Sequence, residues 1–379
     1  MDYTKENLLF KIKKVRRYIR MYGFERTFKK VRSQYHMKAT KKFEGEWINL
    51  NGNKNGDVAV VGCGNFAFST IAHYVTKKTA GKIKYTLDVD TSKSLSLAKQ
   101  YNAYKATTNY QEVIGDPDIR LIYIASNHAS HAEYAIEAIK KGKDVHIEKP
   151  HVVTYEQLNR LERTMIDHPN SKVFLGFNRP RSKLFKRLMN EVSKQQGNIM
   201  MNWFIAGHAI DDNHWYFSEA EGGRVLGNLC HWSDLCLHLV GLKNAFPCII
   251  SPAFAHETKS NFAVSITFAD GSQAALTFSA KGHTFEGVRE YLNVHKGDLL
   301  ASLRDFECLT LDIRDKKLTK SLFYRDHGHL ENIIRSYDAH VKGFSGESIE
   351  YIRGSALLIL KIKEALDTNA ITVCENNLK

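Results

Sequence analysis

The feature that most constrains the fold is a glycine-rich turn between a short apolar strand and a helix. The strand is expected at Val58–Val61, the turn at residues 62–67 reads Gly-Cys-Gly-Asn-Phe-Ala, and helical sequence follows from about Ser69. The first glycine allows a tight turn, the second lets the backbone approach a pyrophosphate, and the small last residue allows close packing of helix on strand. A helix N-terminus adds partial positive charge at the same place. We therefore expect a dinucleotide to bind at Gly62, Gly64, Asn65, Phe66 and Ala67.

An acidic residue closes the next strand, which is expected at residues 84–88. Asp88 stands where a carboxylate accepts hydrogen bonds from the hydroxyls of an adenosine ribose, and its charge repels a 2′-phosphate. The sequence therefore favours NAD over NADP, although Asp90 and Lys93 lie close enough to weaken that preference. A structural turn that binds no nucleotide is the alternative interpretation.

Strands and helices alternate after this turn. Further strands are expected at residues 121–125, 144–147 and 173–177, and helices at 93–100, 131–140 and 155–167. Such alternation is typical of right-handed βαβ units and a parallel sheet. After Pro180, two alternating runs at 262–268 and 273–278 predict a β-hairpin. The expected class is α/β, with a Rossmann-type parallel-sheet domain at 57–180 and an α/β domain with a large, mainly antiparallel open sheet at 181–379.

The positive charge of the chain is concentrated before these domains. The net charge is +13, of which residues 1–56 contribute +10 and the rest only +3. Helical spacing relates Leu8, Ile12, Val15, Ile19 and Tyr22 in this arm, with Lys and Arg between them. Gly23 is expected to end that helix, a second basic segment covers 26–42, and a turn-rich linker follows at 51–56. Residues 1–42 either lie on an anionic membrane surface or a partner, or pack on the protein's own body.

Several classes of function are disfavoured by the composition. The remainder of the chain has no interleaved basic and aromatic patch, so a nucleic-acid partner is not expected. Six cysteines without CxxC spacing argue against a disulfide framework or a structural zinc site. No apolar run approaches the ~20 residues that span a bilayer, and Asp2 and Glu6 argue against a signal peptide. We expect a cytoplasmic protein, with peripheral contact to the inner face of the cell membrane through the arm left open.

Ordered motifs in the body resemble a known family. They are Asn127-His128-x-x-His131, Glu148-Lys149-Pro150, Gly176-Phe177-Asn178-Arg179, His214-Trp215, and the run from Gly222 to Asp234. This combination is similar to the Gfo/Idh/MocA family of NAD(P)-dependent sugar and cyclitol oxidoreductases, over roughly residues 56–370. The resemblance implies a nucleotide-binding domain followed by an α/β domain whose open sheet carries the sugar site and often supports oligomerisation. It therefore implies NAD as the cofactor, a sugar substrate and a homo-oligomer.

The resemblance also implies roles for individual residues. Lys149 matches the catalytic lysine, and His231 matches the histidine that serves as acid and base. Cofactor contacts are implied at Ser126, Asn127, His128, His131, Glu148 and Lys149. Asn178, Arg179 and Arg224 are candidates for holding a carboxylate, phosphate or hydroxyl group of the substrate, Trp215 for stacking on a ring, and Asn228 and Asp234 for further contacts; salt bridges or packed side chains are the alternatives.

One position departs from the family pattern. Many members have an acid four residues before the histidine that corresponds to His231, and Gly227 stands there in this chain. Either that acid is dispensable, or activity is absent. His231, Asp234 and His238 share a helix face, so a metal site is a competing interpretation. Hydride chemistry needs no metal, however, and none is expected.

The catalytic pair makes chemical sense. Oxidation of a secondary alcohol requires a base for the hydroxyl proton, and a histidine with a pKa of about 6.5 serves near neutral pH. A nearby ammonium stabilises alkoxide character in the transition state. The sequence thus predicts an NAD-dependent oxidoreductase that acts on a ring hydroxyl or ketone of a sugar.

A nucleotide-activated sugar in surface-polysaccharide synthesis is the expected substrate. This rests on the arm, where residues 22–27 and 30–32 resemble N-terminal extensions of some surface-polysaccharide members of the family. A catalytically silent NAD-binding scaffold at the membrane is one alternative, and a glycosidase that uses bound NAD for transient oxidation is another.

Overall fold

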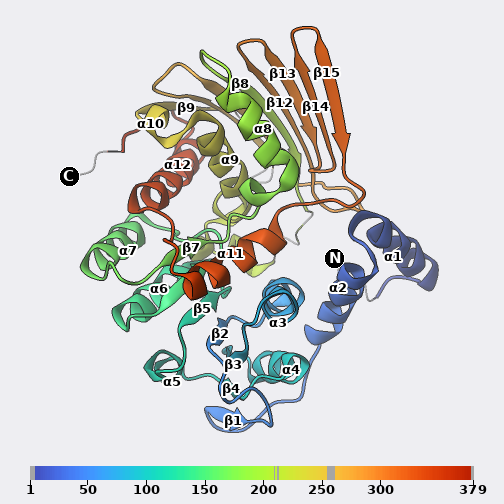
Figure 1. The fold of residues 1–379 in the computed structure, drawn as a ribbon, viewed down its shortest axis with the longest axis vertical. Coiled ribbons are helices and arrows are strands. Elements are labelled where there is room, and N and C mark those ends of the chain that lie inside the picture. The colour runs from blue at the N-terminus through green and yellow to red at the C-terminus, as the bar shows by residue number, and fades with distance from the viewer. Residues whose placement is uncertain (1–4, 209, 211–212, 254–260, 377–379) are drawn as a thin grey trace. The chain divides into compact units, whose positions relative to one another are not determined.

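The computed structural model describes residues 5–208, 210, 213–253 and 261–376 (Figure 1). These residues form two compact units, each built from segments that are distant in the sequence. The open-sheet unit comprises Met1–Gly23, Phe177–Gly328 and Arg353–Lys379, and the Rossmann unit comprises Phe24–Gly176 and His329–Ile352. This grouping shares the arm between both units and returns residues 329–352 to the Rossmann unit, whereas the sequence analysis expected consecutive segments at 1–56, 57–180 and 181–379.

The open-sheet unit is built on a nine-stranded sheet in the order β15-β14-β13-β12-β8-β11-β10-β9-β16. Neighbouring strands are antiparallel except β8 and β11, which are parallel. The predicted hairpin is present as β10 and β11, with Ile266 opposite Ala274. The expectation of a large, mainly antiparallel sheet is confirmed. The strands are β8 (Met200–Ala206), β9 (Cys248–Ala253), β10 (Phe262–Thr267), β11 (Gln273–Ser279), β12 (Arg289–Lys296), β13 (Leu299–Arg304), β14 (Cys308–Ile313), β15 (Lys316–Ser321) and β16 (Thr372–Cys374).

One face of this sheet is covered by helices. Along β8, Trp203 and its neighbours at every second position are buried, while Met200 and Phe204 on the other face are about half exposed. Helix α8 packs on β13 and β14, and α9 packs on α8 (Figure 1). The helices of the unit are α1 (Leu8–Tyr22), η3 (Arg179–Arg181), α8 (Lys183–Ser193), η4 (Trp215–Phe217), η5 (Glu219–Glu221), η6 (Val225–Leu229), α9 (Cys230–Val240), α10 (Leu242–Ala245) and α12 (Ile349–Thr368), which begins in the Rossmann unit.

Helix α1 of the arm docks on the open-sheet unit. The ring of Phe10 stacks on Phe285 with 5.0 Å between centroids, Lys14 Nζ donates to the carbonyl of Thr284 at 2.8 Å, and Arg17 Nε donates to Glu286 Oε1 at 2.8 Å. These three residues follow one another at i, i+4 and i+7 and so share a face. The alternative in which the arm packs on its own protein therefore describes this helix, and charged side chains carry much of the docking.

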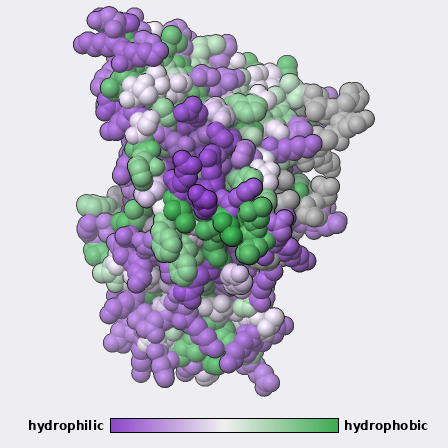
Figure 2. Space-filling model, turned by 90° about the vertical axis from the view of Figure 1, so that its right-hand side faces the viewer, coloured by the Kyte–Doolittle hydropathy of each residue, from purple (hydrophilic) through white to green (hydrophobic). Residues whose placement is uncertain are grey.

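The first part of the apolar stripe that predicted the helix is exposed, whereas Val15, Ile19 and Tyr22 are half-buried. Leu8 is 73% exposed and Ile12 is 48% exposed, with Leu9 between them at 62%. Figure 2, which faces the side where α1 lies at the edge of Figure 1, shows hydrophobic side chains gathered in a patch bordered by hydrophilic ones. Among the residues that the structure describes, no helix combines the length and the apolar character needed to cross a membrane.

The Rossmann unit contains a seven-stranded sheet in the order β1-β4-β3-β2-β5-β6-β7. All neighbours are parallel except β1 and β4. Every residue of β2, β3, β5 and β6 is buried, as continuous apolar runs in doubly covered parallel sheets require. The parallel sheet is confirmed. The strands are β1 (Trp47–Asn49), β2 (Val58–Val61), β3 (Ile83–Leu87), β4 (Lys105–Thr107), β5 (Leu121–Ile124), β6 (Asp144–Ile147) and β7 (Val173–Leu175).

The segment expected to be a linker without packing partners is part of this sheet edge. Strand β1 pairs antiparallel with β4, and the N–H of Asn53 donates to the carbonyl of Asn102 at 2.9 Å. A Cβ on Gly52 would lie 2.1 Å from the carbonyl oxygen of Ala103. The turn residues at 51–56 are therefore needed for close backbone approach rather than for a flexible connection.

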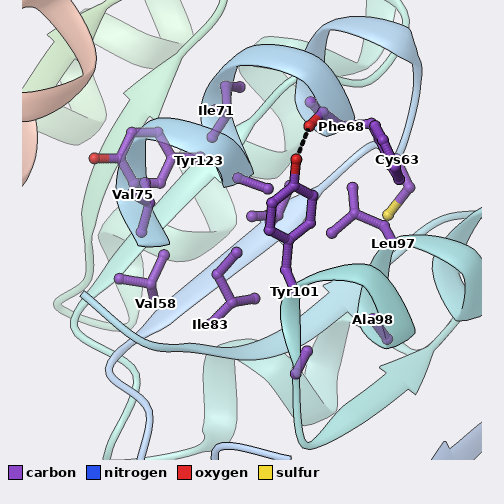
Figure 3. Packing of buried hydrophobic residues seen from close by; sticks show 14 of the residues in the cluster. Val58, Cys63, Phe68, Ile71, Val75, Ile83, Leu97, Ala98, Tyr101 and Tyr123 are labelled. Atoms are coloured by element: carbon purple, nitrogen blue, oxygen red, sulfur yellow. Dashed lines mark hydrogen bonds between the residues drawn. The ribbon is translucent and has the colours of Figure 1, made fainter. Parts of the chain in front are cut away.

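The core on one face of the sheet joins β2 and β3 to the helices η1, α3 and α4 (Figure 3). Val58, Ile71, Ile83 and Leu97 are completely buried there, and the Tyr101 hydroxyl donates to the carbonyl of Phe68 at 2.5 Å. Helix α11 closes this core from the far end of the chain. The helices are α2 (Phe24–His36), η1 (Ala67–Ile71), α3 (Ala72–Lys78), α4 (Thr91–Tyr101), α5 (Tyr110–Gly115), η2 (His128–Ser130), α6 (His131–Lys140), α7 (Tyr155–Asp167) and α11 (His329–Lys342).

Candidate dinucleotide and catalytic site

The glycine-rich turn lies between β2 and η1, where the sequence predicted it. Gly62 has φ +84°, and a Cβ there would lie 2.4 Å from the backbone nitrogen of Ser126, so both conformation and space require glycine. A Cβ on Gly64 would meet nothing within 4 Å, which leaves room for a ligand against the backbone. Ala67 is buried, Asn65 is exposed and Phe66 is half-buried. These features fit the pyrophosphate of a dinucleotide.

Asp88 follows β3 and is tied to the turn. Its Oδ2 accepts the N–H of Cys63 at 2.6 Å and its Oδ1 accepts the N–H of Asp90 at 2.9 Å. Burial raises the pKa of Asp88, while these two donors act in the opposite direction. Each carboxylate oxygen keeps a further lone pair for a ribose hydroxyl. Lys93, which was expected to weaken the NAD preference, lies 3.7 Å from the Asp90 carboxylate and donates to the carbonyl of Ala39.

The loop after β5 carries four of the predicted cofactor residues. His131 is buried, with Nδ1 2.8 Å from the carbonyl of Pro150 and Nε2 3.1 Å from that of Ser126. Burial lowers the pKa of His131, while the carbonyls of Pro150 and Ser126 act in the opposite direction. Asn127 is exposed and accepts from Ser130 Oγ at 2.7 Å, whereas His128 is buried beside His131. The geometry thus gives His131 a positioning role between the loops that follow β5 and β6.

Lys149 leaves the sheet at its carboxyl edge, directly after β6. The preceding residue, Glu148, donates its N–H to Ile124 at the end of β5. Its carboxylate lies against Gly176, where a Cβ would be 2.7 Å from Glu148 Cδ. Glu148 is buried and Lys149 is half-buried. The turn at Gly62, Ser126 and Lys149 therefore share the edge at which doubly wound sheets bind ligands.

His231 and Asp234 lie at the start of α9 in the open-sheet unit, and both are buried. The His231 ring has Phe177 and Trp232 as edge-on neighbours, with centroids 6.1 Å and 6.0 Å away. Asp234 Oδ2 lies 3.6 Å from Nε2 of His238, one helical turn onward. In the described part of the chain, no group of three or more His, Cys, Asp or Glu side chains is arranged to hold a metal ion.

Two predicted substrate residues belong to a buried network in the same unit. Arg179 donates from Nε and Nη2 to both oxygens of Glu290, at 2.8 Å and 3.1 Å. Trp232 Nε1 donates to the same carboxylate at 2.8 Å, and His327 Nε2 lies 3.1 Å from it. Asn178 donates to the backbone carbonyl of His327 at 2.6 Å. The geometry shows a structural use for Asn178 and Arg179, and a substrate contact by either stays a prediction.

The other predicted substrate residues lie on η4 and η6. Arg224 is 3% exposed, and its Nη1 lies 3.4 Å from Asn228 Oδ1. Within the described residues, its buried Nε has no hydrogen-bond partner. Trp215 is 46% exposed. A buried guanidinium and an exposed indole suit an anionic or hydroxylated ring ligand.

Comparisons with known proteins agree with this geometry. Residues 57–177 match the family described as "Oxidoreductase family, NAD-binding Rossmann fold". The "Uncharacterized oxidoreductase YrbE" of Bacillus subtilis (strain 168) is 23% identical over 304 residues, which are 78% of this chain and 82% of the relative. The levoglucosan dehydrogenase of Pseudarthrobacter phenanthrenivorans is 28% identical over 167 residues, 41% of each chain. Residues 57–177 are thus similar to the NAD-binding domain of the Gfo/Idh/MocA oxidoreductases.

Solved structures share the fold. GenD2 from gentamicin A biosynthesis, in complex with NAD, has a TM-score of 0.69 at 19% identity and covers 86% of this chain and 99% of its own. Levoglucosan dehydrogenase in complex with NADH and levoglucosan has a TM-score of 0.70 at 17% identity, and the match covers 84% of this chain and 98% of the dehydrogenase. The family match and the curated relatives thus support an NAD-dependent oxidoreductase, in which the turn and Asp88 are the residues that would hold NAD.

The departure of Gly227 from the family pattern has a physical explanation. A Cβ on Gly227 would lie 2.4 Å from the ring and hydroxyl of Tyr216, which is buried over it. The Tyr216 hydroxyl donates to the carbonyl of Gly227 at 2.7 Å. A carboxylate at this position would displace that ring. Sequence reasoning missed Tyr216, and the aromatic run at 215–217 was the available signal.

We expect the wild-type protein to bind NADH more tightly than NADPH, because the Asp88 carboxylate repels a 2′-phosphate. Asp88→Asn keeps an acceptor for the Cys63 N–H but removes the charge, so the preference should shrink. Asp88→Ala should weaken NADH binding by about 1–3 kcal/mol. Calorimetric titration of both cofactors measures this, with the exposed Asp118→Asn as the control. Equal affinities in the wild type would remove Asp88 from this role.

The buried network predicts a large effect of Glu290→Gln. Burial raises the pKa of Glu290, but Arg179 and His327 outweigh it and lower the pKa to about 2, below the ordinary 4.5. Its stabilisation is therefore complete above about pH 4.5 and is lost as the pH falls toward 2. Removing the charge should cost about 3–5 kcal/mol of unfolding free energy near neutral pH, and the variant should lose less stability than wild type on acidification.

Urea unfolding at neutral and acid pH measures this difference. Asp298→Asn, which breaks the exposed pair with Arg314, is the matched control and should cost about 1 kcal/mol or less. Similar losses for the two variants would show that the Arg179–Glu290 pair contributes no more than a surface pair.

Proposed function

We propose that this oxidoreductase transfers hydride between NAD and a ring hydroxyl or ketone of a sugar, with a nucleotide-activated sugar of surface-polysaccharide synthesis as the substrate. The observation that carries the proposal is Lys149, half-buried at the carboxyl edge of the Rossmann sheet, the same edge at which the glycine-rich turn lies. Levoglucosan dehydrogenase, which shares the fold, is described in complex with NADH and levoglucosan. That relative supports a sugar as the class of substrate.

Lys149 and His231 are the proposed catalytic residues. NAD, when bound at the turn and Asp88, would supply the acceptor for the hydride that leaves the carbon of the reacting hydroxyl. The neutral His231 ring takes the hydroxyl proton, and the Lys149 ammonium stabilises the negative charge that develops on that oxygen. The loop that holds Lys149 is tied to the loop after β5 by His131, which limits its freedom before substrate binds.

Arg224 supports the proposal that the substrate carries an anionic group such as a diphosphate or a carboxylate. Its guanidinium is buried and its Nε lacks a hydrogen-bond partner among the described residues, an arrangement that costs free energy unless an anion binds. A sugar diphosphate or carboxylate supplies such an anion. The exposed Trp215 offers a face for a ring.

The arm and the open sheet support two proposed associations. The outward face of α1 carries Leu8, Leu9 and Ile12 beside Lys11, Lys13 and Arg16, which is the composition of a helix that lies on an anionic membrane.

The uncovered face of the nine-stranded sheet exposes Met200, Phe204 and Leu300. Association of two copies of the chain through this face accounts for the exposed apolar side chains, and sedimentation velocity measures it.

A catalytically silent NAD-binding scaffold is the second candidate. The specific observation that favours it is Tyr216, which fills the space of the acid that many family members have before the histidine. NADH formation from NAD and a panel of sugars and nucleotide sugars separates the two functions. Turnover of any of these substrates excludes the silent scaffold.

Once the panel of sugars and nucleotide sugars has identified a substrate, its turnover tests the catalytic pair. Lys149→Ala and His231→Ala should each reduce kcat by ~10²–10⁴, because each removes a group that acts on the reacting hydroxyl. The affinity for NAD should change little in His231→Ala. The double variant should lose less than the product of the two single losses. Lys141→Ala and His295→Ala, which alter exposed residues of each unit, are the controls. Full turnover by His231→Ala would transfer the acid–base role to Asp234 or Asn228.

The membrane proposal predicts that Leu8→Glu with Ile12→Glu abolishes binding to vesicles that contain phosphatidylglycerol, while NADH binding is kept. Cosedimentation of wild type should weaken with salt, since the Debye length falls from ~10 Å at 0.1 M to ~3 Å at 1 M. Phe323→Glu, at a side chain 87% exposed elsewhere, is the control. Point substitutions are preferable to truncation, because α1 and α2 are packed on the protein. Vesicle binding that persists in the double variant would contradict the proposal.

A further inference from the structure

Helix α2 of the arm has one face buried in the Rossmann unit. Ser33 and His36 on this face are 0% and 4% exposed, whereas Phe24 and Tyr35 are 71% and 66% exposed. The buried face contacts η1, which follows the dinucleotide turn, and α4, which begins three residues after Asp88. Helix α2 lies outside residues 57–177, to which the family match is confined.

His36 holds the turn itself. Its Nε2 lies 2.7 Å from the carbonyl oxygen of Cys63, between the two glycines. A carbonyl oxygen only accepts, so Nε2 carries the proton, and Nδ1 accepts the hydroxyl of Ser96 at 2.9 Å. The ring also stacks on Phe68, with centroids 4.3 Å apart and an interplanar angle of 20°. Two hydrogen bonds and one stacking contact therefore fix the orientation of the imidazole.

This contact sets the direction of the next N–H. The peptide bond between Cys63 and Gly64 is trans, since the cis bonds of the described chain precede prolines. In a trans peptide the C=O and the N–H point in opposite directions. With the Cys63 carbonyl turned toward His36, the Gly64 N–H is directed away from α2. Asp88 holds the N–H of Cys63 on the preceding peptide, so both peptides of the turn are fixed before a ligand arrives.

Two more residues of α2 reinforce the same region. Ser33 Oγ lies 3.1 Å from Oδ1 of Asn65, which follows Gly64. Arg26 donates to the carbonyl of Ser69 and, at 2.8 Å, to Thr70 Oγ1. Ser69 and Thr70 belong to the π-helical turn η1, where wider backbone bonding leaves carbonyls open to side-chain donors.

We propose that α2 is a positioning element of the NAD site and that His36, acting through the Cys63 carbonyl, holds the glycine-rich turn in its NAD-binding conformation. The N-terminal arm thereby helps to shape the cofactor site. Preorganisation of the turn raises affinity by removing the cost of ordering it on binding.

Two substitutions separate the hydrogen bond from the packing. His36→Phe keeps an aromatic ring on Phe68 but removes the donor, and it should raise the Kd for NADH about tenfold. His36→Gln loses the ring but places an amide donor near the Cys63 carbonyl, and it should restore the Kd to within about threefold of wild type. The Kd for ADP-ribose, which contains the same pyrophosphate, should change in these variants in the same way as the Kd for NADH. Tyr35→Ala, at the exposed neighbour on the same helix, is the control.

Full-length variants are titrated with NADH and ADP-ribose by calorimetry, and their Tm values are measured in parallel. A His36→Phe protein that binds NADH like wild type, or a His36→Gln protein as weak as His36→Phe, would overturn the proposal. If His36→Phe does not fold, Ser33→Ala provides the test, and an unchanged Kd there would overturn it. Failure of the wild type to bind NADH would instead contradict the cofactor assignment.

Discussion

The closeness of two backbones at Gly62 is the constraint on which the Rossmann unit depends. A side chain there would collide with the backbone at Ser126, so the turn after β2 and the loop after β5 meet only because residue 62 is glycine. This contact places the turn, the loop and the end of β6 at one sheet edge. Asp88 and His36 then hold Cys63 from opposite sides. The shape of the turn thus depends on two side chains, of which Asp88 is also the proposed ribose contact and His36 comes from helix α2.

In the open-sheet unit, buried ion pairs have the corresponding role. Glu290 unites Arg179, Trp232 and His327, and Glu286 receives both Arg17 of the arm and Arg325. Planar guanidinium groups satisfy such carboxylates with several hydrogen bonds, which makes burial of the charges tolerable. A consequence for specificity is that Arg179 is committed to the fold. The buried Nε of Arg224 has no hydrogen-bond partner among the described residues, so Arg224 is the better candidate for the proposed substrate contact.

Short sequence patterns predicted those elements of the structure that depend only on residues close to one another in the chain. The apolar runs of β2, β5 and β6, the glycine turn and the hairpin of β10 and β11 all follow from short stretches of sequence. Strands β1 and β4 escaped prediction because they have three residues each and include polar side chains. Packing of the arm on its own protein was one of two open alternatives, because hydrophobic periodicity reveals only an apolar stripe, whereas Lys14 and Arg17 dock through charge. Glu290 lies 111 positions from Arg179, so no local signal connected them.

Only the part of the candidate site that lies in recognisable sequence motifs could be predicted from the sequence. Residues 62–67, Asp88 and Lys149 stand at strand ends that the sequence itself indicates. The contribution of His36 could not be read from the sequence, because a histidine on a basic helix normally indicates only a solvated face. The contact of Tyr216 with Gly227 likewise depends on a chain reversal that no short pattern specifies.

The chain passes between its two units at four points, after Gly23, Gly176, Gly328 and Ile352. Three of the four are glycines, and Gly23 and Gly328 both have φ +79°. The first crossing exists only because of the arm, and a single residue there separates α1, tied to Glu286, from α2, tied to Cys63. Gly23 therefore joins a helix anchored in one unit directly to a helix anchored in the other.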